Sequence, residues 1–191
     1  MEEKIIHIVN FKFKCPDNSI IINTTSRSSN WSRGLSPFFL GPIDLYDGHT
    51  ARNMENAWQY SKCYQQHIQD GEPTAEYFKW AKDGWGQLFA NRYPMGKGAV
   101  PLYSLWQGKK LSYIEARKQI YIPLYQKLVT KTQAFVNLTA IYNENSCIYL
   151  QDFDAHNHCS NNLQWEEIIN NPSQKMGHAY VLAMLLAEYL K

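Results

Sequence analysis

Short hydrophobic stretches at the start of the chain follow the pattern of β-strands. Isoleucine and phenylalanine alternate imperfectly with polar residues between positions 4 and 14, and residues 19–23 are rich in isoleucine. Successive side chains of a strand point to opposite faces of a sheet, so this alternation is typical of half-buried strands. The pattern predicts two strands joined by a turn at residues 16–18, followed by a polar loop over residues 24–34.

Helical periodicity dominates the middle of the chain. Apolar residues recur at steps of three and four from Met54 onward, directly after the candidate N-cap Asn53. The Asp70-Gly71 pair is expected to end this helix, because glycine is common just past a helix C-terminus. Residues 74–89 predict a second helix with the same spacing.

The second half of the chain predicts a long helix, a strand and a buried terminal helix. Pro123 lies inside the helical pattern of residues 112–138 and must kink or restart it, because proline lacks the backbone N–H. Residues 147–153 predict a strand with an acidic end. Residues 176–190 are apolar on nearly every side, as in a buried helix. The predicted fold is α+β: a single compact domain over residues 1–191, with several helices packed around a small β-sheet.

The charges of the chain are nearly balanced. Lysine and arginine number 19 and aspartate and glutamate 17, so the formal net charge is +2. This total gives no support for a nucleic-acid partner or an anionic membrane. The longest purely apolar run, residues 179–187, is too short to span a bilayer, which predicts no membrane partner. The sequence leaves the oligomeric state open.

The cysteine pattern predicts reduced thiols in a cytoplasmic protein. The four cysteines are widely spaced, form no C-x-x-C pair and follow no leader sequence. His156, His158 and Cys159 lie close together in the sequence, but a zinc site usually needs ligands at helical or knuckle spacing and a fourth partner. The sequence therefore predicts no metal site and no cofactor.

One face of the first predicted helix carries polar residues of the kinds found in catalytic and binding sites. A helical turn takes about 3.6 residues, so Glu55, Gln59 and Lys62 fall on a single stripe. The stripe adjoins Trp58, which places it beside the apolar side of the helix and predicts a pocket. The alternative is a structural role, because a glutamate in the first turn also stabilises the helix dipole.

Two further groups of residues suit a nucleotide site. Asp152 and Asp154 flank Phe153, so on a strand the two carboxylates would share one face. If Glu55 lay across a cleft from them, the most desolvated carboxyl would hold its proton as a general acid, while its ionised partner activated water or stabilised a sugar cation. The segment Arg92–Gly98 contains two cationic side chains and two glycines, which suits the binding of an anion such as phosphate. The alternative is that this segment is only a turn with solvated charges.

Three short motifs resemble, in order, those of the NADAR (YbiA-like) family. They are Leu35-Ser36-Pro37-Phe38, Asp47-Gly48-His49 and Glu55-Asn56-Ala57-Trp58-Gln59-Tyr60-Ser61-Lys62, against the family pattern L-S-N-F, D-G and E-H-x-x-Q-x-x-K. The resemblance implies an α+β fold and hydrolysis of N-glycosidic bonds, including removal of ADP-ribose from modified guanine, with Glu55 as the catalytic glutamate. The chain departs from the family at Pro37, where the family has asparagine, and lacks the Trp and Gly of a late D-x-x-W-G motif.

Together these features predict a metal-independent N-glycosidase acting on a small-molecule substrate, a nucleotide or ADP-ribose derivative. The predicted catalytic residues are Glu55, Asp152 and Asp154. The predicted substrate-binding residues are Ser36, Phe38, Trp58, Gln59, Lys62, Arg92, Tyr93, Lys97 and Arg117. Two alternatives stay open: a binding protein that captures a nucleotide-derived signal without cleaving it, and an enzyme that modifies a nucleobase within DNA. The missing D-x-x-W-G motif favours the binding protein.

Overall fold

The computed structural model describes residues 4–190 and has an α+β fold. Contacts within the chain define two compact units, of which the first comprises residues 4–36 and 125–190 and the second residues 37–124. Each unit contains both helices and strands, which confirms the predicted class; a single domain over residues 1–191 stays a prediction. Within the described part of the chain, no helix is both long and apolar enough to cross a membrane.

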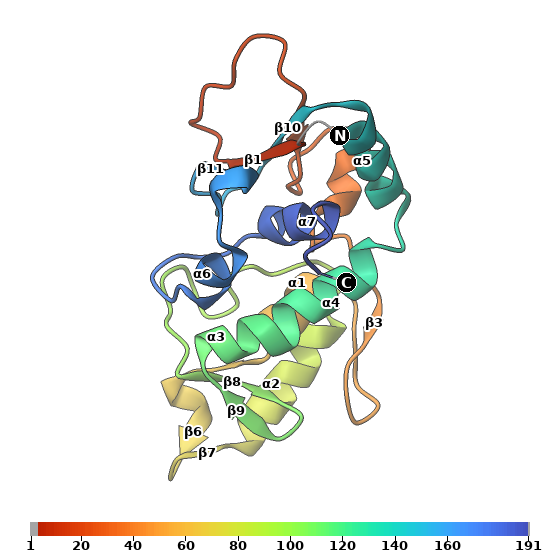
Figure 1. The fold of residues 1–191 in the computed structure, drawn as a ribbon. Helices are drawn as coiled ribbons and strands as arrows, with labels where there is room; N and C mark the ends of the chain where they lie inside the picture. Colours follow the sequence, from red (N-terminus) through yellow and green to blue (C-terminus); the bar gives the residue numbers. More distant parts are fainter. Residues whose placement is uncertain (1–3, 191) are drawn as a thin grey trace. The chain divides into compact units, whose positions relative to one another are not determined.

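The first unit contains a four-stranded sheet (Figure 1). Its strands, in spatial order, are β11 (His158–Cys159), β1 (Ile5–Val9), β10 (Cys147–Gln151) and β2 (Ile21–Asn23). β10 runs parallel to both β1 and β2, whereas β11 is antiparallel to β1. The two predicted N-terminal strands are confirmed, but they are not neighbours, because β10 lies between them and pairs with both.

Among residues 4–190, the first unit also contains two 3-10 helices and three α-helices besides the part of α4 (Ile122–Val129) that belongs to it. They are the 3-10 helices η1 (Trp31–Leu35) and η4 (Ser160–Asn162) and the α-helices α5 (Gln133–Glu144), α6 (Trp165–Asn170) and α7 (His178–Leu186). α7 packs on β1, and α5 packs on η1. Every residue of α7 except Leu185 is buried, which confirms a buried helix within residues 176–190.

The second unit combines small antiparallel sheets with helices. The strand pairs are β3 (Ile43–Asp44) with β4 (Thr50–Ala51) and β6 (Ile68–Gln69) with β7 (Glu72–Pro73), and a third sheet has the order β5 (Lys62–Cys63), β8 (Tyr103–Trp106) and β9 (Lys109–Leu111). The helices are α1 (Met54–Gln59), η2 (Gln65–His67), α2 (Ala75–Gly86), α3 (Tyr113–Ala116), the π-helical turn η3 (Arg117–Tyr121) and α4 (Ile122–Val129). The boundary between the two units falls within α4.

The first predicted helix is much shorter than the sequence suggests. α1 ends at Gln59, and the chain enters β5 three residues later. The Asp70-Gly71 pair instead forms the turn between β6 and β7, with φ angles of 51° and 81°. An Asp-Gly pair with two positive φ angles is a favoured turn of two-residue β-hairpins. The prediction that one helix extends to residue 70 is therefore wrong, because the pair marks a hairpin and not a helix end.

The second predicted helix is confirmed as α2. The hydroxyl of Thr74 accepts from the backbone N–H of Tyr77 and caps the helix, which ends at Gly86. Gly84 allows close packing between helices, since a Cβ at this position would lie 2.0 Å from the ring of Tyr60. Gly84 lowers the intrinsic stability of the helix, but the close contact with the ring of Tyr60 leaves room only for glycine at this position.

The third predicted helix is interrupted twice. The π-helical turn η3 precedes Pro123, and a regular α-helix restarts at Ile122, as the proline predicts. The chain leaves the helix again after Val129, whose carbonyl accepts from the hydroxyl of Thr132 at 2.7 Å. Thr132 then caps α5 by accepting from the backbone N–H of Phe135 at 3.1 Å. The expectation that the helix restarts at Pro123 and then continues through residue 138 is wrong in its second part, because α4 ends at Val129 and α5 begins at Gln133.

Candidate functional site

α1 holds Glu55 in a buried position at the beginning of a helix. The side chain of Asn53 caps the helix by accepting from the backbone N–H of Asn56 at 2.9 Å. The backbone N–H of Glu55 donates to the carbonyl of Pro37 at 3.1 Å, which holds the segment of Phe38 against the helix start. Glu55 is only 6% exposed. A carboxylate at this depth needs specific partners, because burial removes most of its solvation.

A chain of hydrogen bonds runs from Glu55 to Lys62. Nε2 of Gln59 donates to Oε1 of Glu55 at 2.8 Å, and Nζ of Lys62 donates to Oε1 of Gln59 at 2.7 Å. Lysine only donates and a carboxylate only accepts, so the amide of Gln59 is fixed in one orientation between them. The predicted stripe is thus present, although Lys62 lies in β5 and not on the helix. The arrangement links a buried carboxylate to an ammonium through a neutral amide.

One aromatic side chain contacts Lys62 of this series, and a second ring packs on the first. Nζ of Lys62 lies 4.7 Å from the ring centroid of Trp58, within the range of a cation–π contact. The ring of Tyr121 meets that of Trp58 at 5.2 Å with an interplanar angle of 63°. Trp58 is only 8% exposed, whereas Tyr93 in the following loop is 42% exposed. Of these two predicted substrate-binding residues, Tyr93 presents the more open ring.

Cys63 follows Lys62 but does not add a nucleophile to the site. Burial raises the pKa of its thiol to about 11, and the neighbouring hydroxyls of Tyr77 and Tyr103 lower it by less. The thiol therefore stays protonated near neutral pH. A reactive cysteine needs a depressed pKa and access to solvent, and Cys63 has neither.

The segment Arg92–Gly98, here named the cationic loop, is exposed over most of its length. Gly96 and Gly98 adopt φ angles of 91° and 92°, a region that favours glycine. The guanidinium of Arg92 lies 5.5 Å from the ring centroid of Tyr93, and Lys97 is exposed at the tip. Asn56 bonds to the backbone just before this loop, so the predicted phosphate-binding segment and α1 belong to one substructure.

Arg117, one of the predicted substrate-binding residues, is buried in the structure. It is 2% exposed and opens the π-helical turn η3, where its guanidinium carbon lies 4.6 Å from the ring centroid of Tyr113. Single π-helical turns recur at functional sites because they displace side chains from the regular helical spacing. Pro123 is the only local signal of this irregularity, and it does not reveal that Arg117 is buried.

A family model matches residues 3–182, most of the chain. The chain belongs to this family of unknown function, DUF6939. No curated protein and no solved structure gave a significant match to the chain.

In this DUF6939 chain the remaining predicted site residues belong to the first unit. Ser36 is buried, and its backbone N–H donates to the carbonyl of Arg33 at the end of η1. β10 ends at Gln151, so Asp152 and Asp154 lie in a turn where the N–H of Asp154 donates to Oδ1 of Asp152 at 3.3 Å. The expectation that the two carboxylates share one strand face is wrong, because the strand stops before them.

Asp152 is 3% exposed and organises the start of α7. Its Oδ2 accepts from the backbone N–H of Ala179 at 3.2 Å and lies 3.2 Å from Nδ1 of His178. Gly177 leaves room for this carboxylate, since a Cβ there would lie 2.2 Å from Oδ2. The opposite nitrogen of His178 bonds to the carbonyl of Thr24 at 2.7 Å. These contacts give Asp152 and His178 a structural task that sequence spacing did not reveal.

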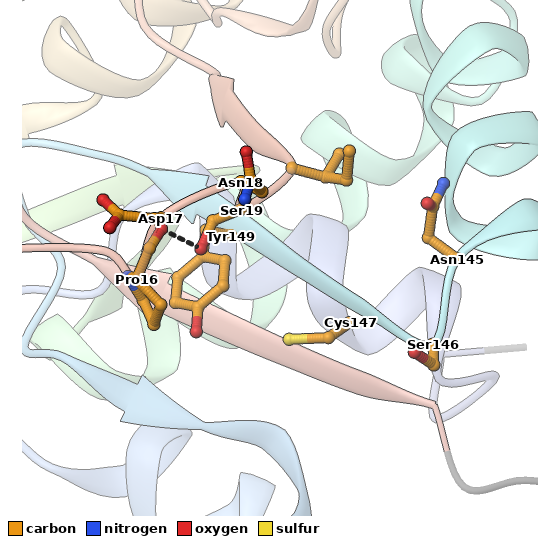
Figure 2. A pocket seen from close by; sticks show the side chains of 9 residues that line it. Pro16, Asp17, Asn18, Ser19, Asn145, Ser146, Cys147 and Tyr149 are labelled. Carbon is orange, nitrogen blue, oxygen red and sulfur yellow. Dashed lines mark hydrogen bonds between the residues drawn. The ribbon is translucent and has the colours of Figure 1, made fainter.

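An open depression of about 320 Å³ in the first unit lies apart from the predicted residues. Figure 2 shows Cys147 and Tyr149 of β10 beside the turn of Pro16 to Ser19, where the hydroxyl of Ser19 donates to the carbonyl of Pro16 at 2.7 Å. None of the residues predicted for catalysis or substrate binding lines this depression. Within residues 4–190, the structure contains no group of three histidine, cysteine or acidic side chains placed to hold a metal ion.

Proposed function

We propose that this DUF6939 protein is a metal-independent N-glycosidase that hydrolyses a nucleotide or ADP-ribose derivative, for example ADP-ribosylated guanine. The observation that carries the proposal is the bonded series Glu55, Gln59 and Lys62, which holds a buried carboxylate in one orientation. The resemblance of the same residues to the NADAR motif E-H-x-x-Q-x-x-K supports the reaction class. The near neutrality of the chain gives no support for DNA as the target.

The proposed reaction breaks the bond between the anomeric carbon and a base nitrogen. The electron pair of that bond leaves with the nitrogen, which takes up a proton from the acid. The oxygen of a water molecule attaches to the anomeric carbon, and this water gives up one proton, which restores the acid. Glu55 acts as the acid or stabilises the positive charge that develops on the sugar, and Gln59 keeps its carboxyl in place. Positioned acid–base catalysis of this kind contributes about 10² to 10⁴-fold in rate.

The remaining predicted residues take roles in binding. In the proposal Arg92 and Lys97 hold phosphate and the exposed ring of Tyr93 stacks on a base. Phe38, Trp58 and Arg117 of the second unit complete the substrate contacts. A binding role for Ser36 and a catalytic role for Asp152 or Asp154 stay predictions from the sequence.

A purely binding protein is the second candidate. The D-x-x-W-G motif of the resembled family is reduced here to Asp152 followed by Phe153, Asp154, Ala155 and His156, without its Trp and Gly. A protein that keeps the nucleotide pocket and has lost part of the chemistry fits this departure. It predicts stoichiometric capture of an intact ligand, whereas an enzyme predicts many turnovers.

One experiment separates the two candidates. Purified protein is incubated with NAD⁺, ADP-ribose, ADP-ribosylated guanosine and cyclic ADP-ribose isomers, and all species are weighed by mass spectrometry before and after heat denaturation. A released base in excess over protein supports the glycosidase. An intact ligand recovered only after denaturation supports the binding protein. If no compound gives either result, both candidates are refuted.

Glu55→Gln tests the catalytic residue and has a matched control. The variant keeps the size of the side chain but loses the acid, so turnover should fall at least about 10²-fold while ligand binding is retained. Glu115→Gln changes another glutamate in the first turn of a helix, one that is exposed and forms a capping box with Ser112. Glu115→Gln should keep native turnover. Native turnover in Glu55→Gln would contradict the assignment.

A further inference from the structure

Asn56, the residue after the candidate catalytic glutamate, ties α1 to a distant part of the chain. Its side chain is completely buried. Its Nδ2 donates to the carbonyls of Gln87 and Phe89 at 3.1 Å each, and its Oδ1 accepts from the backbone N–H of Asn91 at 2.8 Å. Two carbonyl partners require the NH₂ side of the amide, so its orientation is fixed. All three bonds reach the backbone immediately before the cationic loop.

The cationic loop itself is held mainly by short-range turns. The N–H of Gly96 donates to the carbonyl of Tyr93 at 3.0 Å, and that of Ala99 to the carbonyl of Gly96 at 3.3 Å. Beyond the loop, the N–H of Leu102 donates to the carbonyl of Cys63 at 2.8 Å. Tyr93 in the loop is 42% exposed, and Val100 just after the loop is 81% exposed. The bonds of Asn56 therefore fix the near end of the loop relative to α1.

We infer that Asn56 is a positioning residue that sets the place of Arg92 and Lys97 relative to α1, and thereby the contact of these cations with the phosphates of the ligand. The inference rests on the proposed function and deepens it, because it assigns the recognition of phosphate to a loop held by the helix that carries Glu55. In these bonds Asn56 touches only backbone groups just before the loop, so it acts on the ligand through the two cations.

The test measures binding in a Glu55→Gln background, in which turnover does not interfere. Two probes are used in calorimetry: ADP-ribose, which carries phosphates, and adenosine, which does not. Asn56→Asp keeps the shape and the accepting oxygen but places a second oxygen against two carbonyls. Loss of two hydrogen bonds should raise the Kd for ADP-ribose about tenfold or more and leave that for adenosine unchanged. Asn56→Ser, a smaller change, is the second variant and should show the same selectivity.

A control and a double-mutant cycle separate positioning from general support of the fold. Gln87→Ala removes the side chain that accepts from the hydroxyl of Tyr60 but leaves the carbonyl used by Asn56, so ADP-ribose binding should stay native. In a protein that also carries Arg92→Gln and Lys97→Gln, the effect of Asn56→Asp should disappear, because coupled residues are not additive.

The outcomes distinguish this inference from the proposed function. A selective loss of ADP-ribose binding that vanishes without the two cations supports the positioning role. An equal loss for both probes, or a loss that persists without the cations, overturns it, as does an absence of ADP-ribose binding. Binding with this selectivity, together with no turnover in the protein that retains Glu55, refutes the glycosidase and leaves the inference standing.

Discussion

Nζ of Lys62 donates to Oε1 of Gln59 at 2.7 Å, although Lys62 belongs to β5 and Gln59 to α1. The chain leaves the helix directly after Gln59 and still returns the ammonium to the amide. Because lysine has no acceptor, this contact turns the NH₂ of Gln59 toward Glu55. The position of Lys62 therefore decides how the buried carboxylate is held.

Lys62→Met should lower turnover without abolishing ligand binding. The variant keeps an unbranched side chain beside Trp58 but leaves the amide of Gln59 free to rotate away from Glu55. Hydrogen bonds to charged groups contribute about 1.5–3 kcal/mol, so kcat should fall about tenfold or more. Lys110→Met, which removes an exposed lysine paired with Glu72, is the control. Equal kcat values in steady-state assays of the two variants would sink the prediction.

Asp152→Ala should destabilise the protein whether or not the residue takes part in catalysis. The substitution leaves the buried N–H of Ala179 without its acceptor and removes the carboxylate beside Nδ1 of His178, which costs about 1–3 kcal/mol. Asp17→Ala, at an exposed position in the turn after β1, should change stability little. Urea denaturation followed by circular dichroism measures both. An unchanged midpoint for Asp152→Ala would show that its carboxylate does not hold the start of α7.

Gly84→Ala and Gly86→Ala should have opposite effects on stability. A Cβ at Gly84 would lie 2.0 Å from the ring of Tyr60, so the first variant should lose about 1–3 kcal/mol through overpacking. A Cβ at Gly86 meets nothing within 4 Å, so the second should be neutral or gain about 0.4–1 kcal/mol from the lower entropy of the unfolded chain. Thermal unfolding of the two variants compares them directly. Equal losses would contradict the assigned contact.

His67 should make part of the stability depend on pH. Burial lowers the pKa of its imidazole below the ordinary value of 6.5. The unfolded chain therefore binds the proton first, and the contribution of His67 is present above pH 6.5 and is lost as the pH falls through the folded pKa. The free energy of unfolding should fall more steeply between pH 6.5 and the onset of acid unfolding in the native protein than in His67→Gln.

The slope, and not the absolute stability, decides this prediction. His67→Gln also changes packing against Trp80 and the backbone bond from Tyr64, which shifts stability at every pH. Burial lowers the pKa of His7 and His158 as well, so a smaller slope should remain in the variant. Identical slopes in urea titrations across this range would contradict the assignment to His67.

The sequence by itself determined the features that depend on neighbouring residues. Alternation placed β1 and β2, uniform apolarity identified α7 as buried, and the side chains of Asn53 and Thr74 cap the helices that they were expected to start. These signals are local because a cap or a periodic face is complete within one or two turns of chain. They were sufficient for the α+β class.

Only the tertiary structure decided where α1 ends and what its polar residues hold. The pairing of Lys62 with Ser104 draws the chain into a sheet after Gln59, and the carbonyls that satisfy Asn56 come from a loop beyond α2. In the same way Asp152 leaves its strand to accept from Ala179. Each of these hydrogen bonds depends on backbone donors and acceptors that lie far along the chain. The sequence shows that these groups exist, but it does not show which donor will pair with which acceptor.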